Sequence, residues 1–198
     1  ESTRRISELR VTIGYVRRNP LWRQLGPGKI HVDIVDYPGE WLIDLPMLGE
    51  PYEQWSVKAV DQTRDPRRTK AASAFTSFLA GVTADQPLDE AVAQLGARIF
   101  TDYLRAVRDG DAGPVVEGPG RFLMPGDLEG SPLLTFFPLD LTPNRRLQRG
   151  SLGQAMERRY EAYKSHVVQP FFRDHLARLD RQIVLVDALA AIDKGAPA

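Results

Sequence analysis

The stretch His31-Val32-Asp33-Ile34-Val35-Asp36-Tyr37-Pro38-Gly39-Glu40-Trp41, or HVDIVDYPGEW, runs from a β-branched apolar segment into an acid, a Pro-Gly turn and a second acid. One interpretation is an ordinary strand end, since Asp before a Pro-Gly turn is common for reasons of turn geometry. The other is a strand end that holds a metal ion beside the phosphates of a nucleotide. The rest of the sequence is needed to choose between these two interpretations.

Composition limits the protein classes that are compatible with this sequence. The chain has 198 residues, of which 42% are hydrophobic and 26% charged, as expected for a globular domain with a real core. Lys plus Arg and Asp plus Glu balance at 26 each, so no overall charge attracts nucleic acid. There is no cysteine, and His31, His166 and His175 have no metal-ligand spacing, which disfavours a zinc site.

The sequence also predicts where the protein works. The apolar run from Ile183 to Ile192 is interrupted by Asp187 and is too short to span a bilayer. No signal peptide opens the chain, which begins at Glu1 rather than at Met. We therefore expect a cytoplasmic protein, and a piece of something longer.

Two strands are predicted near the beginning of the chain. Residues 7–16 alternate apolar and polar side chains, as in a half-buried strand, and residues 30–35 form a second apolar run. Asn19-Pro20 and Gly26-Pro27-Gly28 punctuate the connection of about ten residues between them. We expect an antiparallel pair.

The central part of the chain has a helical pattern. Apolar residues recur at helical spacing over 71–79 and again over 88–107, where Pro87 and Asp89-Glu90 mark a helix start. Residues 109–143 are rich in Gly and Pro but contain the apolar clusters 121–124 and 133–137. These clusters predict an ordered, packed excursion rather than a flexible linker.

The last part returns to a mixed pattern. Residues 154–180 predict a long charged helix or helix pair with a break or kink at Pro170. Ile183-Val184-Leu185-Val186-Asp187 is typical of a strand that is buried on both faces of a parallel sheet. Asp187 would end near the same sheet edge as Asp36, or would cap the helix that follows. The pattern indicates an α/β domain with a large, mostly helical insertion.

Asp36-Tyr37-Pro38-Gly39 has the D-x-x-G form of a nucleotide switch. In such proteins the acid helps hold Mg²⁺, and the glycine amide approaches the γ-phosphate. A phosphate-binding loop, G-x-x-x-x-G-K-[ST], should accompany it. The nearest candidate, Gly28-Lys29, fails, because Arg23 stands at the required first glycine and Ile30 at the required Ser or Thr. No Asn/Thr-Lys-x-Asp motif for reading guanine is found either.

Several blocks of the sequence resemble the YcjX-like family of bacterial P-loop nucleotidases, a family linked to envelope and heat stress. The blocks are residues 34–48 and, in order, Ser7-Glu8-Leu9-Arg10, Gly120-Arg121-Phe122, Pro125-Gly126-Asp127, Phe136-Phe137-Pro138 and residues 178–187. The resemblance implies a GTPase-like α/β three-layer fold and hydrolysis of GTP or ATP with Mg²⁺. The family's phosphate-binding loop would precede Glu1 and its Thr-Lys-Ala-Asp element would follow Ala198, so the chain is expected to be a central fragment.

On this resemblance the chain divides into three parts. Residues 1–48 would belong to the α/β nucleotidase core and carry the switch segment, residues 49–170 would form the helical insertion, and residues 171–198 would return to the core. Partners would be the nucleotide and a protein bound through the insertion, without nucleic acid or a transmembrane segment. Peripheral association with the inner membrane is a further expectation.

The resemblance also assigns roles to individual residues. Asp36 would hold Mg²⁺ through water, Gly39 would contact the γ-phosphate, and Glu40 would orient the attacking water as the catalytic group. Thr3 would act as a switch threonine that reaches Mg²⁺ and the nucleotide, although a threonine in a loop is often a turn or cap residue. The alternative function is a non-catalytic regulatory or scaffold module whose insertion, Glu50 to about Gln169, binds a partner.

Other conspicuous residues have structural interpretations. Trp41, Leu42 and Leu45 are expected to pack a short helix onto the sheet. Arg178 and Arg181 around Asp180 suggest an ion pair or a helix end. The pairs Arg145-Arg146 and Arg158-Arg159 are predicted to lie on solvated faces, and His175 on the surface or in a satisfied position.

Overall fold

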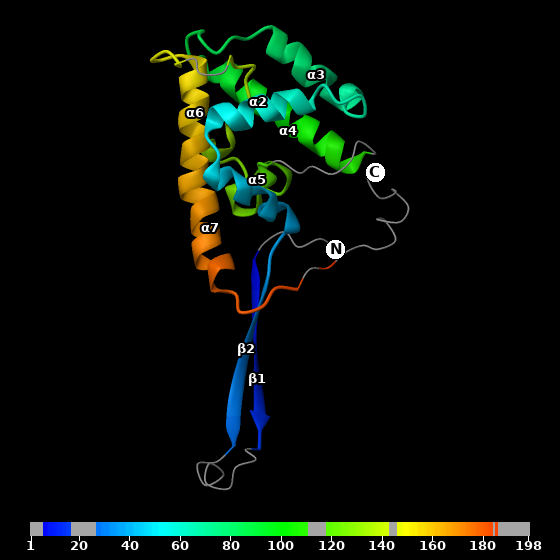
Figure 1. Ribbon diagram of the computed structural model, residues 1–198, viewed down its shortest axis with the longest axis vertical. Coiled ribbons are helices and arrows are strands. Elements are labelled where there is room, and N and C mark those ends of the chain that lie inside the picture. Colours follow the sequence, from blue (N-terminus) through cyan, green and yellow to red (C-terminus); the bar gives the residue numbers. More distant parts are fainter. Residues whose placement is uncertain (1–5, 17–26, 111–117, 143–145, 184, 186–198) are drawn as a thin grey trace. The chain divides into compact units, whose positions relative to one another are not determined.

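The computed structural model describes residues 6–16, 27–110, 118–142, 146–183 and 185 (Figure 1). It forms two compact units, a hairpin unit (Glu1–Gly39) and a helical unit (Glu40–Ala198). The boundary falls inside the HVDIVDYPGEW stretch, between Gly39 and Glu40. The three-part division expected from the sequence stays a prediction.

The hairpin unit contains two antiparallel strands, β1 (Ser7–Tyr15) and β2 (Gly28–Asp36). The pairing runs from Ser7 opposite Asp36 to Tyr15 opposite Gly28, which confirms the predicted antiparallel pair. Because side chains alternate between the faces of a strand, this register gathers the apolar residues on one face. They are Leu9, Val11, Ile13, Ile30, Val32 and Ile34.

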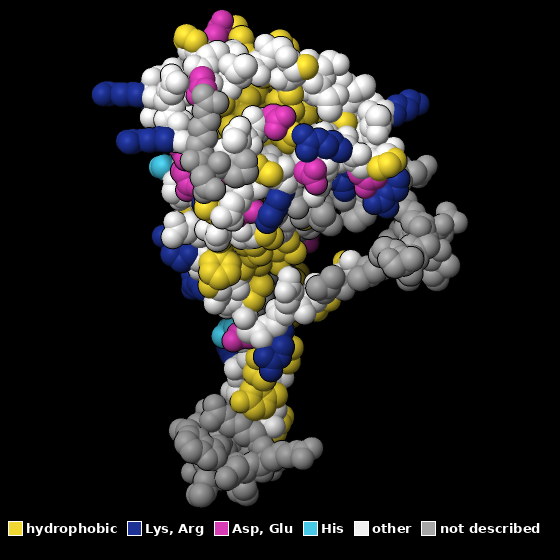
Figure 2. Space-filling model, turned by 45° about the horizontal axis from the view of Figure 1, so that its top comes forward, with side chains coloured by type: hydrophobic (Ala, Val, Ile, Leu, Met, Phe, Trp, Pro, Cys, Tyr) yellow, Lys and Arg dark blue, Asp and Glu magenta, His cyan; other side chains and the backbone are white. Residues whose placement is uncertain are grey.

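That apolar face is exposed rather than half-buried as expected. Leu9 is 59% exposed and Ile34 is 49% exposed, and Figure 2 shows hydrophobic side chains along the hairpin. The reason is that a sheet of two strands has no interior strand and buries little by itself.

The 3-10 helix η1 (Gly39–Gly49) starts at the last residue of the hairpin unit, and the rest of it opens the helical unit, which continues through short and long helices. The α-helices are α2 (Tyr52–Gln62), α3 (Thr69–Ala80), α4 (Glu90–Asp109), α5 (Gly120–Leu123), α6 (Leu152–Tyr163) and α7 (Gln169–Asp174). The short turns are the 3-10 helices η2 (Gly126–Leu128), η3 (Pro132–Leu134) and η5 (Leu176–Arg178), and the π-helical turn η4 (Lys164–Val168).

Helices α3 and α4 follow the predicted periodicity. The Asp89 side chain caps α4 by accepting hydrogen bonds from the N–H groups of Ala91 and Val92. The inner face of α4 then buries Ala93, Ala97, Phe100, Leu104 and Val107. Gly96 lets α4 lie against Phe137, because a Cβ there would collide with that ring.

The described Gly- and Pro-rich residues 118–142 are packed into the core, as predicted. Phe136 and Phe137 are fully buried. Tyr52 on α2 donates a hydrogen bond to the Phe137 carbonyl at 2.9 Å, and the Ser56 hydroxyl bonds both backbone groups of Leu139. Side chains of α2 therefore replace the hydrogen bonds that a regular element would supply.

The predicted break near Pro170 occurs as a π-helical turn just before that proline. Helix α6 is capped by Ser151 and passes through η4 into α7, where Pro170 lies in the first turn (Figure 1). Pro170 has no N–H to donate, and it follows directly on the wider hydrogen bonding of η4, in which the Gln169 N–H donates to the Lys164 carbonyl.

The strand predicted at the end of the chain falls mostly outside the described residues. Ile183 and Leu185 have irregular backbone and are 87% and 93% exposed. Val184, Val186 and Asp187 are not among the described residues.

Candidate functional site

The D-x-x-G turn follows β2 directly. Asp36 is the last residue of β2 and is exposed, and Gly39 is exposed at the start of η1. A Cβ at Gly39 would meet nothing within 4 Å, and its φ lies outside the left-handed region. Neither backbone conformation nor packing among the described residues therefore requires glycine at this position.

The other predicted site residues are distributed differently. Glu40 is half-buried and belongs to the helical unit, whereas Asp36 and Gly39 belong to the hairpin unit. The pKa of Arg108 is raised chiefly by its hydrogen bond to Asp109, and Glu40 adds to that effect. Glu40 thus lies in the field of Arg108. Thr3 lies outside the described residues.

The segment after the turn presents one buried face. The buried residues of η1 are Trp41, Asp44 and Met47, three residues apart. A 3-10 helix has about three residues per turn, so these side chains lie above one another. Trp41 contacts the Phe171 ring edge-on at 5.6 Å, which places it in the helical unit with α7.

Asp44 is a buried carboxylate that joins distant segments. It is 2% exposed, its Oδ1 accepts the Gly120 N–H at 2.5 Å, and its Oδ2 accepts the Tyr163 hydroxyl at 2.6 Å. Burial raises its pKa to about 6, and the hydrogen bonds and the charge of Arg121 limit that rise. Asp44 therefore ties η1 to both α5 and α6.

Arg121 forms a second connection between the same segments. Its guanidinium carbon lies 3.2 Å from the centroid of the Trp41 ring, and its Nη1 pairs with Asp127 at 3.0 Å. The Trp41 indole N–H donates to the Met124 carbonyl at 2.9 Å. The charge of Arg121 is thus compensated by Asp127, with Asp44 close by.

Two glycines make this close approach of η1 and α5 sterically feasible. A Cβ on Gly120 would collide with the Glu40 carbonyl, and one on Gly118 would lie 2.5 Å from an Asp44 oxygen. Trp55 donates its indole N–H to the Gly118 carbonyl at 3.2 Å. The backbone of Glu40, next to the turn, therefore rests directly on α5.

These contacts fasten η1 within the helical unit. Gly39 ends the hairpin unit and Glu40 begins a segment that is fastened at Trp41, Asp44 and Met47.

Sequence reasoning missed Asp44, although a signal was present. Asp44 is the one acid within the apolar run Trp41 to Leu45. An ionisable residue on an apolar helical face is either buried with partners or exposed by a bend. Its partners, Gly120 and Tyr163, are 76 and 119 residues away, so their identity could not be read from spacing.

The described part of the chain lacks a cluster of metal ligands and a membrane-spanning helix. No three His, Cys, Asp or Glu side chains there gather closely enough to hold a metal ion. No helix in the same residues is both long and apolar enough to cross a membrane.

Comparison with known proteins identifies the relatives of this chain. The model of the YcjX-like family, DUF463, matches residues 1–198. The chain belongs to the YcjX-like family. This confirms the resemblance inferred from the sequence blocks.

Two curated relatives of the YcjX-like chain carry the name Ras-like GTPase YcjX. The protein of Shewanella oneidensis is 35% identical over 204 residues, covering 98% of this chain and 41% of the relative. The protein of Escherichia coli strain K12 is 34% identical over 201 residues, covering 98% of this chain and 42% of the relative. The chain therefore spans about two fifths of the length of these relatives.

The blocks that indicated the YcjX-like family meet in the structure around Asp44. Trp41 and Asp44 come from the block 34–48, Gly120 and Arg121 from the block Gly120-Arg121-Phe122, and Asp127 from the block Pro125-Gly126-Asp127. Three segments that are separate in sequence thus form one network.

Proposed function

We propose that this chain provides the metal- and γ-phosphate-contacting turn of a bacterial P-loop GTPase, together with a helical unit that responds to that turn. The observation that carries the proposal is the D-x-x-G turn, which leads without interruption into the buried segment η1. The printed name of the relatives, Ras-like GTPase, favours GTP over ATP as the substrate. We include in this proposal a cytoplasmic location for the protein and a role in the stress response.

The hairpin unit would then be part of a larger three-layer α/β sheet. The apolar face of β1 and β2, which includes Leu9 and Ile34, is the surface that a covering layer of such a fold would bury. The helical unit would be the insertion that follows the switch. Because the chain spans about two fifths of the length of these relatives, we expect it to lack hydrolytic activity by itself.

The residues of the turn fit a magnesium-dependent reaction. Mg²⁺ commonly takes one or two protein carboxylates, with water and substrate phosphates completing its shell, so a single exposed carboxylate is sufficient at Asp36. Magnesium, when bound, neutralises charge that develops on the phosphates. Asp36 would hold that ion through water, Gly39 would present its amide N–H to the γ-phosphate, and Glu40 would orient the attacking water.

Gly39 supports the assignment of this turn to a phosphate site, because the fold does not require a glycine there. Gly39 has open space around its Cα and needs no left-handed backbone, so the fold of the described residues would accept alanine there. A requirement for close approach by a phosphate would explain a glycine at this position.

The direct test is the substitution Asp36→Asn in a polypeptide of the full length of the relatives. Loss of a metal-holding carboxylate should lower magnesium-dependent GTP hydrolysis by roughly 10- to 100-fold. The measurement is phosphate release at saturating GTP and varied Mg²⁺. The matched control is Asp33→Asn, which removes an exposed carboxylate of the same strand that pairs with Arg10. Equal turnover in wild type and Asp36→Asn would refute the assignment.

The scaffold alternative is distinguished by binding rather than by turnover. A fluorescent GTP analogue should bind the full-length polypeptide saturably, and the binding should depend on Mg²⁺. Absence of nucleotide binding, with the polypeptide folded, would favour a non-catalytic module that binds a partner through its helical unit.

A further inference from the structure

A hollow of about 630 Å³ lies beside the beginning of α6 and is lined mainly by cationic and amide side chains. Its lining consists of Arg146, Leu147, Gln148, Arg149, Gln154 and Arg158. Arg146 to Arg149 come from the loop before α6, and Gln154 and Arg158 stand four residues apart on one face of that helix. Two elements thus bring three arginines to one hollow, and among the residues that the structure describes no carboxylate lines it.

The arginines of this hollow differ from most others in the helical unit. Carboxylates within 4.0 Å pair with Arg64, Arg67, Arg105, Arg108, Arg121, Arg159 and Arg173. Within the described part of the chain, Arg146, Arg149 and Arg158 form no such ion pair. Three like charges around one hollow repel each other, and an anion between them relieves that repulsion.

Arg159 follows Arg158 in α6 but has different surroundings. It pairs with Glu90 at 2.6 Å and donates to the Thr135 carbonyl at 3.0 Å, so it does not lie on a merely solvated face as expected. Arg158, the preceding residue, points into the hollow instead. The adjacent arginines therefore serve different surfaces of α6.

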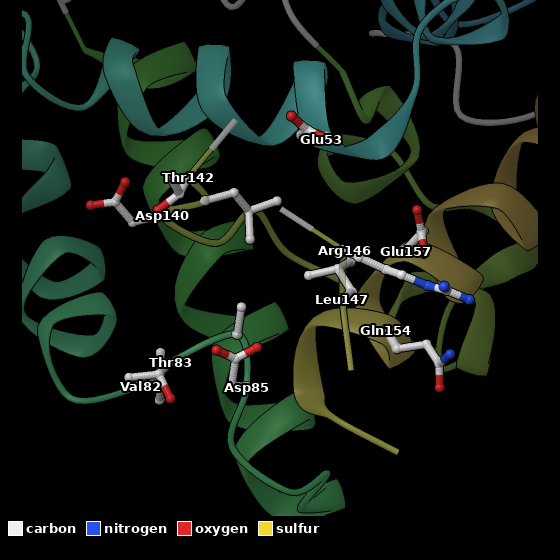
Figure 3. A pocket seen from close by; sticks show the side chains of 12 residues that line it. Glu53, Val82, Thr83, Asp85, Asp140, Thr142, Arg146, Leu147, Gln154 and Glu157 are labelled. Atoms are coloured by element: carbon white, nitrogen blue, oxygen red, sulfur yellow. The ribbon is translucent and has the colours of Figure 1, made fainter. Parts of the chain in front are cut away.

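A second hollow of about 640 Å³ shares Arg146, Leu147 and Gln154 with the first. It also contains four acidic residues, Glu53, Asp85, Asp140 and Glu157. Figure 3 shows Arg146 extending toward α6, which carries Gln154 and Glu157. These carboxylates would repel an anion from the second hollow. The anion would therefore bind in the first hollow, near Arg149 and Arg158.

We propose that the arginine hollow (Arg146, Arg149, Arg158, Gln148 and Gln154) binds a phosphate group. Guanidinium groups bind phosphate through paired N–H donors, and the two glutamine amides add neutral donors. The phosphate could belong to a soluble phosphate compound or to a lipid headgroup. This inference is independent of the nucleotide site proposed above.

One observation bears on the lipid source. Leu88 donates its backbone N–H to the Gly150 carbonyl at 3.1 Å and is 39% exposed, so an exposed apolar residue is hydrogen-bonded to the residue that follows Arg149. An arginine with an exposed leucine beside it matches the boundary between headgroups and acyl chains. A soluble phosphate has no apolar group that the Leu88 side chain could contact.

The experiment uses the 198-residue chain and two probes in low salt. Inorganic pyrophosphate is titrated calorimetrically, and sedimentation is measured with phosphatidylglycerol vesicles, with phosphatidylcholine vesicles as the uncharged reference. The site variant is Arg146→Gln/Arg149→Gln/Arg158→Gln. The control variant, Arg64→Gln/Arg67→Gln/Arg105→Gln, removes the same charge from arginines that pair with carboxylates elsewhere.

We expect the site variant to lose about tenfold or more in affinity for at least one probe and the control variant to lose less than about twofold. Pyrophosphate binding without vesicle binding supports a soluble phosphate compound. Binding to anionic vesicles that falls in Leu88→Ser, with pyrophosphate binding unaffected, supports a lipid headgroup. Equal losses in the two triple variants, or no saturable binding of either probe by wild type, would overturn the proposal.

Discussion

Asp44 shows how one residue can determine the response of a whole segment to pH. Its carboxylate is buried with a hydroxyl and an amide donor, and Arg121 is the nearby cation that faces it. Arg121 is in turn paired with Asp127. Ionised Asp44 is therefore only partly compensated, and its pKa rises to about 6 from 3.8.

The raised pKa predicts that stability falls as pH rises. Between pH 4 and pH 6 the folded chain keeps the Asp44 proton while the unfolded chain releases it, so the stabilisation present below pH 4 is lost as pH passes 6. A shift of about two units corresponds to about 3 kcal/mol. Urea unfolding at pH 4 to 7.5 should show this fall in wild type and a smaller one in Asp44→Asn, which has no carboxyl group to titrate. Its amide oxygen can still accept the Gly120 N–H, and its amide nitrogen can donate to the Tyr163 hydroxyl oxygen. Parallel curves for the two proteins would contradict the assignment.

Two glycines near the turn should separate folding from function. Gly120→Ala places a Cβ against the Glu40 carbonyl and should lower the free energy of unfolding by about 2 kcal/mol or more, because backbone must shift. Gly39→Ala meets open space and should change that free energy by less than about 0.5 kcal/mol. If the turn contacts a phosphate, Gly39→Ala should nevertheless impair GTP hydrolysis in a full-length polypeptide. Unfolding curves and phosphate release distinguish these effects.

At the scale of elements, the pattern of apolar residues predicted the helices and the strand pair that local interactions stabilise. Helices α3 and α4 and the pairing of β1 with β2 followed from periodicity, and the start of α4 followed from Asp89. The π-helical turn was not predictable, because its wider hydrogen bonding has no residue signature comparable to proline. The sequence located the disturbance at Pro170, only two residues after this turn ends.

The candidate site was predictable as a turn but not as a network. Asp36 and Gly39 could be proposed from the sequence because an acid at a strand end is followed three residues later by a glycine. The contacts of Asp44 depend on Gly120 and Tyr163, and only the tertiary fold brings those residues together. The exposure of the β1–β2 hairpin was likewise not evident, because alternation predicts an apolar face without showing what covers it.

At the scale of the whole molecule, the two units have different sources of stability. The hairpin unit is held by the ladder between β1 and β2. The helical unit has an aromatic core and is closed around Asp44, Gly120 and Tyr163. Because the units share only the chain at the turn as a covalent connection, their local opening can be measured separately.

Tyr163→Phe tests this division with the loss of one hydroxyl. The substitution leaves Asp44 without its side-chain donor in a buried environment, which should lower the stability of the helical unit by about 1–3 kcal/mol. Hydrogen exchange should accelerate at η1 and at residues 120–124, while amides of β1 and β2 change by less than about 0.5 kcal/mol. Tyr15→Phe, which removes an exposed hydroxyl from β1, is the control and should leave the helical unit unaffected. If Tyr163→Phe accelerated exchange equally in both units, the two would open as one cooperative structure, and the division of stability between them would be wrong.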